Sequence, residues 1–565
     1  MNTIKTNPVK TDARLTLMTA LKLLGGYVRE HYQYLAVLLF TFAALGAVAF
    51  LNIATSNTIV SYSLSDYEIG QIADRTITAV KTLPADAENP ASLLKGEKIT
   101  RKGFPITEGD YQKLKKMAET RSYIDYRAFA DTMLYLLLVL IFWFFLFSIT
   151  APAGKARTGE FVMFSCFLAL IYVLAVFARK IHFFDTAFAL PIASPGALCV
   201  ILAVIIYGRN VAVAFSVIVF LVVLNAASYE VAAPLFVLAS CIASVRIVRN
   251  ISRRIDMVAA SILLALLNTV FMVALKIIFT ASFVDSPTLL PAIAFNGFIS
   301  CILSLGLLTP LEYLLNTASV FRLMDLSDLN TPLMRRFMLT APGTYNHTLM
   351  VATLAESACT EIGANALLAR IGAYYHDLGK MEHPEYFVEN QTGYNRHDEI
   401  NPRLSVAVIK SHVKKGVEKC RQLHLPEEVI NIVSEHHGNG VIAYFFNEAK
   451  KQEENVDQED FSYSGSPPES RESAVVMLAD TVEAACRTLE KPTASRLEKF
   501  IDQLCAAKVE HHQLDRCSLT FRELDQIKNA FLQILCGYYH SRIEYPDQKD
   551  PDAKEGGQRP EGGKE

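Results

Sequence analysis

The sequence predicts an all-α protein in which a multi-span helical membrane bundle is followed by a cytoplasmic all-helical domain. Hydrophobic residues make up 51% of the 565 residues, and residues 128–316 are almost continuously apolar. Residues 321–545 instead have the mixed composition of a globular domain, with apolar residues at helical spacing. The net charge of −3 gives no sign of a surface for DNA or RNA.

A first apolar run at residues 34–53 follows a leader, residues 1–33, that carries five lysine and arginine residues. The run is long enough to cross a bilayer, which takes about 20 apolar residues. A cleaved signal peptide usually has a shorter apolar core and a small-residue cleavage site. We therefore expect an uncleaved signal anchor, followed by a short extracytoplasmic segment at residues 54–127. None of the ten cysteines lies in this segment, so no disulfide framework is predicted.

Residues 128–320 are predicted to form a seven-transmembrane bundle, because seven further apolar runs follow one another there. The short loops on the N-terminal side carry Lys155, Arg157, Arg209, Arg246, Arg249, Arg253 and Arg254. The opposite short loops carry only two such residues, Arg179 and Lys180. Because positively charged loops tend to stay in the cytoplasm, this difference predicts that both termini lie there. Lys276, near a span end, is expected to reach the membrane interface. The predicted spans are about 129–150, 158–178, 187–207, 211–225, 229–247, 257–279 and 292–315.

Histidines are concentrated in the C-terminal domain, where eight of the thirteen lie between residues 347 and 437. The segment from Ala341 opens a helix that Thr344 can cap, and His347 shares a face of it with Val351 and Leu354. Four further helices bring polar side chains to inward positions in the same way, and one of these helices is expected to stop at Gly416. The inward set is His347, His376, Asp377, His412, His436, His437 and Asp480.

These residue types predict a metal site. Neutral imidazole and carboxylate suit iron, manganese, zinc or nickel. Seven ligands are too many for one ion but fit two ions that share a carboxylate and leave positions open for water. No thiolate is offered, which argues against a structural zinc site. A single inward histidine is usually a core residue, but an HD pair, an HH pair and two more inward histidines together favour two divalent transition-metal ions, manganese or iron.

The other histidines of the domain fall outside this pattern. His397 is expected at the mouth of the site. The rest are assigned to the surface, and they are His383, His424, His511, His512 and His540.

The arrangement of His347, His376-Asp377 and Asp480 resembles the HD phosphohydrolase superfamily. The chain is more closely similar to the PgpH-type cyclic di-AMP phosphodiesterases, bacterial seven-transmembrane proteins with an intracellular HD domain. The likeness covers the membrane bundle and the domain at 321–545. It is carried by the stretches PGTYNHTLMVATLAE (342–356), YYHDLGKMEHPEYFVENQ (374–391), IVSEHHG (432–438) and FSYSGSPPESRESAVVMLADTVEAACR (461–487).

The resemblance implies a role for each residue of the set. His347, His376, Asp377 and Asp480 would hold one metal ion, and Asp377 would bridge to a second ion held by His412, His436 and His437. Asp377 and Lys380 would be the catalytic residues. Lys380 occupies the position of the family's HD-x-G-K lysine, which would face a substrate phosphate, although a solvated lysine at a helix end is an equal alternative.

The activity that the resemblance implies is hydrolysis of cyclic di-AMP to linear pApA, with regulation through the membrane bundle. The expected partners are a cyclic dinucleotide substrate and membrane lipid, without DNA or RNA, and a homodimer is left open. The expected location is the bacterial inner membrane. The family usually has a large extracytoplasmic domain, whereas residues 54–127 match only its start and its end. The tail at 546–565 is expected to be disordered.

Three alternatives to this activity are considered. A cyclic di-GMP phosphodiesterase of the HD-GYP type would carry a GYP tripeptide soon after the HH pair, but here Gly-Asn-Gly-Val-Ile-Ala-Tyr follows His437. The (p)ppGpp hydrolases of the HD superfamily lack this membrane anchor. A membrane receptor that binds nucleotide without cleaving it remains open, although the complete ligand set argues against an inactive site.

Overall fold

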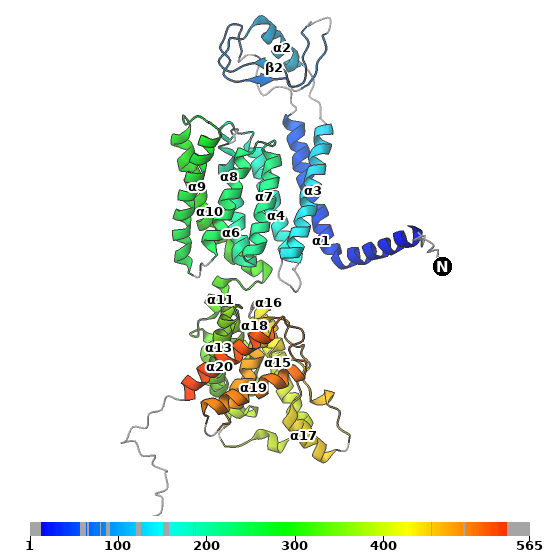
Figure 1. Cartoon of the computed structure of the whole chain (residues 1–565), viewed down its shortest axis with the longest axis vertical. Coiled ribbons are helices and arrows are strands. Elements are labelled where there is room, and N and C mark those ends of the chain that lie inside the picture. The colour runs from blue at the N-terminus through cyan, green and yellow to red at the C-terminus, as the bar shows by residue number, and fades with distance from the viewer. Residues whose placement is uncertain are drawn as a thin grey trace, which may run out of the picture. The chain divides into compact units, whose positions relative to one another are not determined.

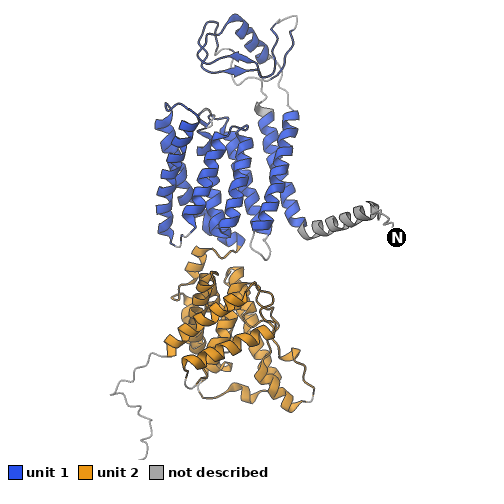
Figure 2. Ribbon diagram, viewed as in Figure 1, with its two compact units in different colours: residues 1–315 blue, residues 316–565 orange. Residues whose placement is uncertain are grey.

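The computed structural model of the protein describes residues 13–56, 64, 67–79, 81–85, 91–119, 126–150, 158–184, 186, 188–249, 251, 253–391, 393–453, 455–489 and 492–539. These residues form two compact units, within residues 1–315 and 316–565 (Figure 2). Almost all regular structure in them is helical, which confirms the all-α class. The start of the leader, residues 1–12, His540 and the tail at 546–565, which is predicted to be disordered, lie outside the described residues.

The first unit contains six described helices that are long and apolar enough to cross a membrane, which confirms a multi-pass membrane protein. Each overlaps one of the predicted spans. They are α1 (Ala13–Ser56), whose apolar part is Tyr32–Ile53, α3 (Tyr126–Thr150), α4 (Thr158–Ala178), α7 (Arg209–Ala226), α9 (Arg254–Ile278) and α10 (Ser286–Leu315) (Figure 1).

Two further apolar helices of this unit, α6 (Gly196–Tyr207) and α8 (Ala232–Val248), are shorter. The predicted span at 187–207 is divided, because α5 (Leu190–Ala193) ends before Pro195, which has no N–H for a continuous helix. Gly208 alone joins α6 to α7, with φ at 83°, a conformation that glycine adopts without strain. The tight turn between these two helices therefore depends on this residue.

The segment between α1 and α3 forms a small module with its own apolar core. β1 (Ile77–Thr78) pairs antiparallel with β2 (Lys98–Thr100), and α2 (Glu108–Glu119) follows. Leu93, Ile99, Leu114 and Met117 are among the side chains of its core. This module, which is predicted to lie outside the cytoplasm, can thus bury apolar surface within itself.

Lys276, which is predicted to reach the membrane interface, lies near the end of α9 and is buried against the connection to α10. Its side chain is 1% exposed, and its ammonium donates a hydrogen bond to the carbonyl of Ser282 at 2.7 Å and pairs with Asp285. A buried cation needs such partners, because a charge without them is costly in an apolar surrounding. The lysine therefore fastens the connection between α9 and α10.

The second unit is a bundle of helices joined by 3₁₀ turns. Its helices are α11 (Val320–Leu326), α12 (Pro332–Thr340), α13 (Pro342–Glu361), α14 (Ala366–Tyr375), α15 (Pro402–Gln422), α16 (Glu427–Glu435), α17 (Ala443–Gln452), α18 (Arg471–Cys486), α19 (Ala494–Glu510) and α20 (Phe521–Tyr539). Its 3₁₀ turns are η3 (Leu378–Glu382), η4 (Pro384–Tyr386), η5 (Val388–Asn390), η6 (Arg396–Glu399) and η7 (Glu459–Phe461).

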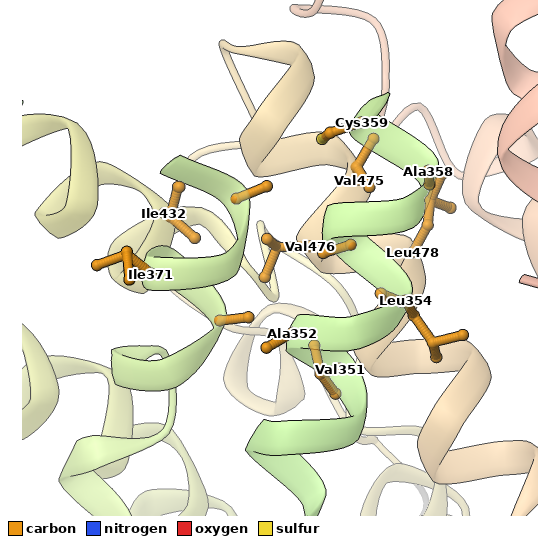
Figure 3. Close-up of a cluster of buried hydrophobic side chains, with 14 of the residues drawn as sticks. Val351, Ala352, Leu354, Ala358, Cys359, Ile371, Ile432, Val475, Val476 and Leu478 are labelled. Carbon is orange, nitrogen blue, oxygen red and sulfur yellow. The ribbon is translucent and has the colours of Figure 1, made fainter. Parts of the chain in front are cut away.

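One apolar core holds these helices together. Val351 and Leu354 of α13, Ile371 of α14, Ile432 of α16 and Val476 of α18 are all buried in it (Figure 3). The helices that supply this core also carry most of the predicted ligands. The position of the site is thus fixed by ordinary hydrophobic packing.

Gly379 and Gly416 lie at a close contact between η3 and α15. α15 continues past Gly416 to Gln422, so the predicted stop is wrong. Gly416 instead faces Gly379 of η3, and a Cβ on Gly379 would lie 1.9 Å from the carbonyl oxygen of His412. Gly379 therefore cannot carry a larger side chain without moving backbone, whereas a Cβ on Gly416 would press on the side chain of Val433 at 3.2 Å. The pair lets η3, which follows Asp377, lie directly against α15.

Candidate metal centre

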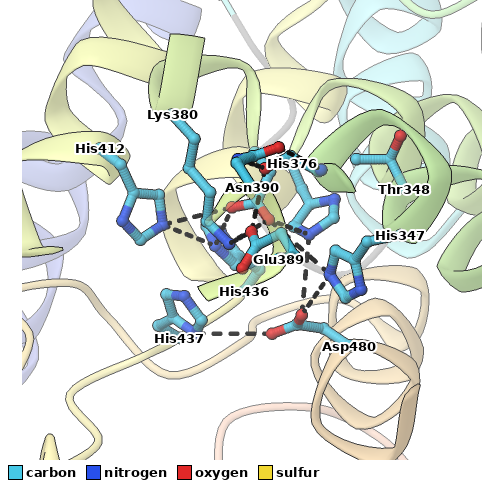
Figure 4. Close-up of polar contacts among 12 residues, drawn as sticks. His347, Thr348, His376, Lys380, Glu389, Asn390, His412, His436, His437 and Asp480 are labelled. Carbon is cyan, nitrogen blue, oxygen red and sulfur yellow. Dashed lines mark hydrogen bonds and ion pairs between the residues drawn. The ribbon is translucent and has the colours of Figure 1, made fainter. Parts of the chain in front are cut away.

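All seven predicted ligands come together in the second unit. His347 lies on α13, His412 on α15 and Asp480 on α18. His376 and Asp377 lie between α14 and η3, and His436 and His437 directly follow α16. Figure 4 shows the histidine rings and the Asp480 carboxylate converging on one region. His437 is half-buried and the other six side chains are buried.

Three of the histidines are oriented by their own backbone. The Nδ1 of His376 donates to the carbonyl of Ala373 at 2.7 Å, that of His412 to Ile409 at 2.5 Å, and that of His436 to Val433 at 2.7 Å. A carbonyl only accepts, so these bonds place the ring proton on Nδ1. In the neutral rings of His412 and His436, the Nε2 atom is then left with a free lone pair, as a metal ligand requires. His376 offers the same lone pair once its Nε2 has lost a proton.

Asp377 presents one carboxylate oxygen to each half of the cluster. Its Oδ2 lies 3.2 Å from Nε2 of His376 and 3.7 Å from Nε2 of His347. Its Oδ1 lies 3.4 Å from Nε2 of His412 and 3.8 Å from Nε2 of His436. This is the arrangement that a carboxylate bridging two ions needs.

Asp480 and Glu483 complete the first half. Asp480 Oδ1 lies 3.0 Å from Nε2 of His347 and 3.8 Å from Nε2 of His376, and its Oδ2 lies 3.6 Å from Nδ1 of His437. Glu483, one turn further along α18, accepts a hydrogen bond from Nδ1 of His347. Ligand atoms that lie within 4.8 Å of one another include the groups His347, His376, Asp480 and His412, His436, His437.

The electrostatics of the metal-free site divide the histidines. Burial alone would lower the pKa of His347, but the carboxylates of Asp480 and Glu483 raise this pKa to about 9. Burial alone would also lower the pKa of His376, but the carboxylates of Asp377 and Asp480 raise it to about 10. A metal ion would therefore have to displace a proton from each of these two rings.

Burial lowers the pKa of His412 to about 4 and that of His436 to about 3, so both rings are neutral at pH 7. Burial alone would raise the pKa of Asp377, but His376 and Lys380 hold it well below its usual range. Neutral imidazole and ionised carboxylate are the forms that bind a metal ion.

The acceptor atoms of this site would be better satisfied with a bound cation than without one. Nε2 of His412 lies 3.4 Å from Nε2 of His436, and both lone pairs face Asp377 Oδ1, which is buried and has no hydrogen-bond partner among the described residues. Three acceptors without a proton between them leave desolvated groups uncompensated, at a cost of about 1–3 kcal/mol for each. A divalent ion between them would remove that cost.

Lys380 is held inside the site. Its Nζ lies 2.7 Å from Asp377 Oδ2 and 3.0 Å from Glu389 Oε1, above the ring of Phe387. Only 12% of its side chain is exposed, so the alternative of a solvated lysine is wrong. Burial alone would lower the pKa of Lys380, but Asp377 and Glu389 raise it above its usual range. Its contact with a substrate phosphate remains a prediction.

The site opens into a cavity of about 430 Å³ whose lining combines polar and aromatic side chains. Lys380, Glu389 and four of the predicted ligands are among the polar lining residues. His397 lines the same cavity, in agreement with its predicted place, while His383, His424, His511 and His512 are exposed. The aromatic lining consists of Tyr386, Phe387, Tyr444, Phe445 and Tyr463.

Thr344 does not cap α13 as predicted. The N-cap residue of that helix is Ala341, with Pro342 in the first turn, and Thr344 instead donates from its hydroxyl to Glu389 Oε1 at 2.9 Å. Glu389 is thus a site residue that sequence reasoning missed, because the 3₁₀ turn around it has no periodic pattern. Glu483 is predicted from its spacing of three to share a helix face with Asp480, but the predicted site does not include it.

Comparison with known proteins gives two matching families. The family described as HD domain matches residues 344–485, and the family described as 7TM receptor with intracellular HD hydrolase matches residues 126–319. Among curated proteins, the cyclic-di-AMP phosphodiesterase PgpH of Listeria monocytogenes is 31% identical over 506 residues, which cover 88% of this chain and 69% of that protein.

A second curated relative and one solved structure are also similar. The cyclic-di-AMP phosphodiesterase PgpH of Bacillus subtilis is 34% identical over 405 residues, 70% of this chain and 56% of that protein. The crystal structure of the L. monocytogenes PgpH HD domain in complex with cyclic-di-AMP is 40% identical and covers 38% of this chain and all of that domain, with a TM-score of 0.37. This chain therefore spans between half and about two thirds of the length of these full-length relatives.

Proposed function

The chain belongs to the PgpH family of membrane proteins with an intracellular HD hydrolase domain, and on this premise we propose that it hydrolyses cyclic di-AMP to linear pApA. The HD domain supports the broader class, a metal-dependent phosphodiesterase, and the cyclic dinucleotide substrate is the finer part of the proposal. The observation that carries the proposal is the pair of donor clusters that meet at the two oxygens of Asp377.

We propose that two divalent ions, manganese or iron, occupy this centre. His347, His376, Asp377 and Asp480 would hold the first, and His412, His436 and His437 would hold the second together with Asp377. When bound, such ions supply Lewis acidity to the phosphate and lower the pKa of water. The protein contributes the fixed Nε2 directions and a buried, pre-oriented set of charges.

The cavity beside the centre supports a nucleotide substrate. The ammonium of Lys380 is placed to attract a phosphate, and Glu389 keeps it in position by an ion pair of 3.0 Å. Tyr386, Phe387, Tyr444, Phe445 and Tyr463 offer ring faces on which bases can stack. The base is not selected by stacking alone, so the preference for adenine rests on the family.

In the proposed reaction, one of the two phosphodiester bonds of cyclic di-AMP is hydrolysed. Water adds to one phosphorus, the bond from that phosphorus to the 3′ oxygen breaks, and the 3′ oxygen takes up a proton. The 5′ phosphate stays on the product, which is the linear dinucleotide. The buried histidines and carboxylates exclude bulk water around the scissile bond and fix the phosphate against Lys380.

The membrane half supports a location in the bacterial inner membrane with both termini in the cytoplasm. The proposal of this orientation rests on the lysine and arginine bias of the short loops, of which residues 155 and 157 lie outside the described residues. The catalytic unit would then meet a cytoplasmic nucleotide.

The experiment that tests the function is turnover by the full-length protein in detergent, loaded with Mn²⁺ or Fe²⁺. Cyclic di-AMP, cyclic di-GMP and ppGpp are compared, and products are separated by chromatography. We expect pApA from cyclic di-AMP and slower or no turnover of the other two. If the protein binds cyclic di-AMP tightly but releases no pApA with either ion, the proposal of an enzyme fails. The second candidate, a membrane receptor that binds the nucleotide without cleaving it, would then take its place.

A further inference from the structure

A second cavity, of about 610 Å³, lies next to the metal centre and plays no part in the chemistry above. We call it the basic cavity. It is formed by one face of α15, by Ser434 and Gly438 at the end of α16, and by residues 463–465. His437 and Tyr463 line both this cavity and that of the metal centre, and their rings stack with centroids 4.3 Å apart. The two cavities thus share one wall of side chains.

The charge of the basic cavity is strongly one-sided. Lys410, Lys414 and Arg421 line it, and Glu418 is the one acidic side chain in its lining. The spacing of four and seven residues places the three cations on one face of α15. None of them has an ion pair among the described residues, whereas Lys419 on the same helix pairs with Glu382 at 3.6 Å. The lining therefore gives the cavity a net positive charge, with Glu418 opposing one of the three cations.

The cavity is also lined by residues 463–465, which pack closely against the end of α16. The N–H groups of Ser464 and Gly465 make no backbone hydrogen bond within the described part of the chain. A Cβ on Gly465 would lie 2.8 Å from the carbonyl oxygens of both Gly438 and Ser434, so the segment is packed directly against the end of α16. Lysine and arginine side chains, together with backbone N–H groups that are unpaired among the described residues, make a lining that suits a phosphate group.

We propose that the basic cavity is a phosphate subsite, which holds a second phosphate group of the nucleotide that is cut at the metal centre. This inference rests on the proposed function. A cyclic dinucleotide carries two phosphodiesters, of which one is cut, so the other must lie somewhere beyond the metal centre. Because His437 and Tyr463 border both cavities, the basic cavity adjoins the metal centre at these two rings, and a ligand would have to extend past them to contact both. The subsite would thus favour dinucleotides over diesters with a single phosphate.

The test uses full-length protein in detergent, loaded with Mn²⁺, and the double variant Lys410→Gln/Lys414→Gln. The control is Lys415→Gln/Lys499→Gln, which removes the same charge from positions outside the lining. Each protein is assayed with cyclic di-AMP and with bis(p-nitrophenyl) phosphate, which has a single phosphate. We expect the double variant to lose about tenfold more kcat/KM on cyclic di-AMP than on the single-phosphate diester. Equal losses on the two substrates, or no loss beyond that of the control, would overturn the subsite.

A second measurement separates this inference from the proposed function. EDTA-treated full-length protein is dialysed against radiolabelled inorganic phosphate, so that neither turnover nor a metal contributes. Binding by the wild type and the control, but not by the double variant, supports the subsite even if cyclic di-AMP is not a substrate. Equal binding by all three proteins, or by none, overturns it even if cyclic di-AMP is cut.

Discussion

Asp377 Oδ1 lies 3.4 Å from Nε2 of His412, and no proton stands between the two atoms. The ring proton of His412 is on Nδ1, where the carbonyl of Ile409 accepts it, and burial keeps the ring neutral with its pKa at about 4. The other oxygen of Asp377 faces His376 and His347. One carboxylate therefore faces two groups of ring nitrogen atoms, which accounts for its place at the centre of the site.

The first prediction concerns metal content. Wild-type protein should hold close to two ions per chain, and Asp377→Ala should lose both, because the carboxylate serves both halves of the cluster. Atomic emission analysis of the purified proteins measures this. Asp460→Ala, which removes an exposed carboxylate paired with Arg403, should keep both ions. One ion per chain in a fully active wild type would rule out the two-ion centre.

The second prediction separates turnover from binding at the second half of the cluster. In His436→Ala, kcat should fall at least a hundredfold, since a ligand that fixes charge at the reacting phosphate is lost. The dissociation constant for cyclic di-AMP should change by only a few fold, because Lys380 and the aromatic lining remain. Steady-state kinetics and a binding isotherm measure the two. The exposed His511→Ala serves as control, and parallel losses in both quantities would contradict the assignment.

The seven convergent residues could be predicted because each lies in a helix or directly after the end of one, where apolar neighbours indicate the inward face. His347 with Val351 and Leu354 on α13 is one example, and all three are buried. The all-α class and the several membrane spans could be predicted from the long apolar runs of the sequence. Thr344, Gly416 and Glu389 could not be predicted, because their roles depend on contacts between segments far apart in sequence. The hydroxyl of Thr344 has its partner 45 residues away, and local rules offered a cap instead.

The third prediction concerns Lys380, whose positive charge pairs with Asp377 and Glu389 in the metal-free site. Lys380→Met leaves Asp377 and Glu389 without their cation, so the metal-free protein should lose about 3–5 kcal/mol of stability, the usual cost of breaking a buried ion pair. Added Mn²⁺ should recover part of this loss, because the ion pairs with Asp377. Thermal unfolding with EDTA and with Mn²⁺ measures both effects.

Two controls belong to that experiment. Lys451→Met breaks an exposed pair with Glu448 and should leave the midpoint of unfolding almost unchanged. Glu389→Gln should weaken the hold on Lys380 while leaving Asp377 paired. A Lys380→Met protein as stable as the wild type in EDTA would show that the buried pair does not support this part of the fold.

The fourth prediction concerns the contact of η3 with α15. Gly379→Ala places a Cβ 1.9 Å from the carbonyl oxygen of His412, so the two backbones must separate. We expect a loss of about 1–3 kcal/mol in the free energy of unfolding, and a loss of metal because Asp377 and His412 move apart. Gly537→Ala is the matched control, since no atom lies within 4 Å of its Cβ, and it should be neutral or stabilise α20 by up to about 1 kcal/mol.

The fifth prediction is the orientation of the chain in the membrane. A reporter fused after Glu565 that is active only in the cytoplasm should be active, because the loops with Arg209, Arg246 and Arg249 are expected on the same side as both termini. The small module with β1, β2 and α2 should lie on the opposite face, so a cysteine introduced at Lys102, which is exposed, should react with a membrane-impermeant reagent in intact cells. A cysteine at Lys414 should react only after the cells are opened. Labelling of both positions in intact cells would mean that the catalytic unit faces outward, where it could not meet a cytoplasmic nucleotide, and the proposed substrate would have to be abandoned together with the orientation.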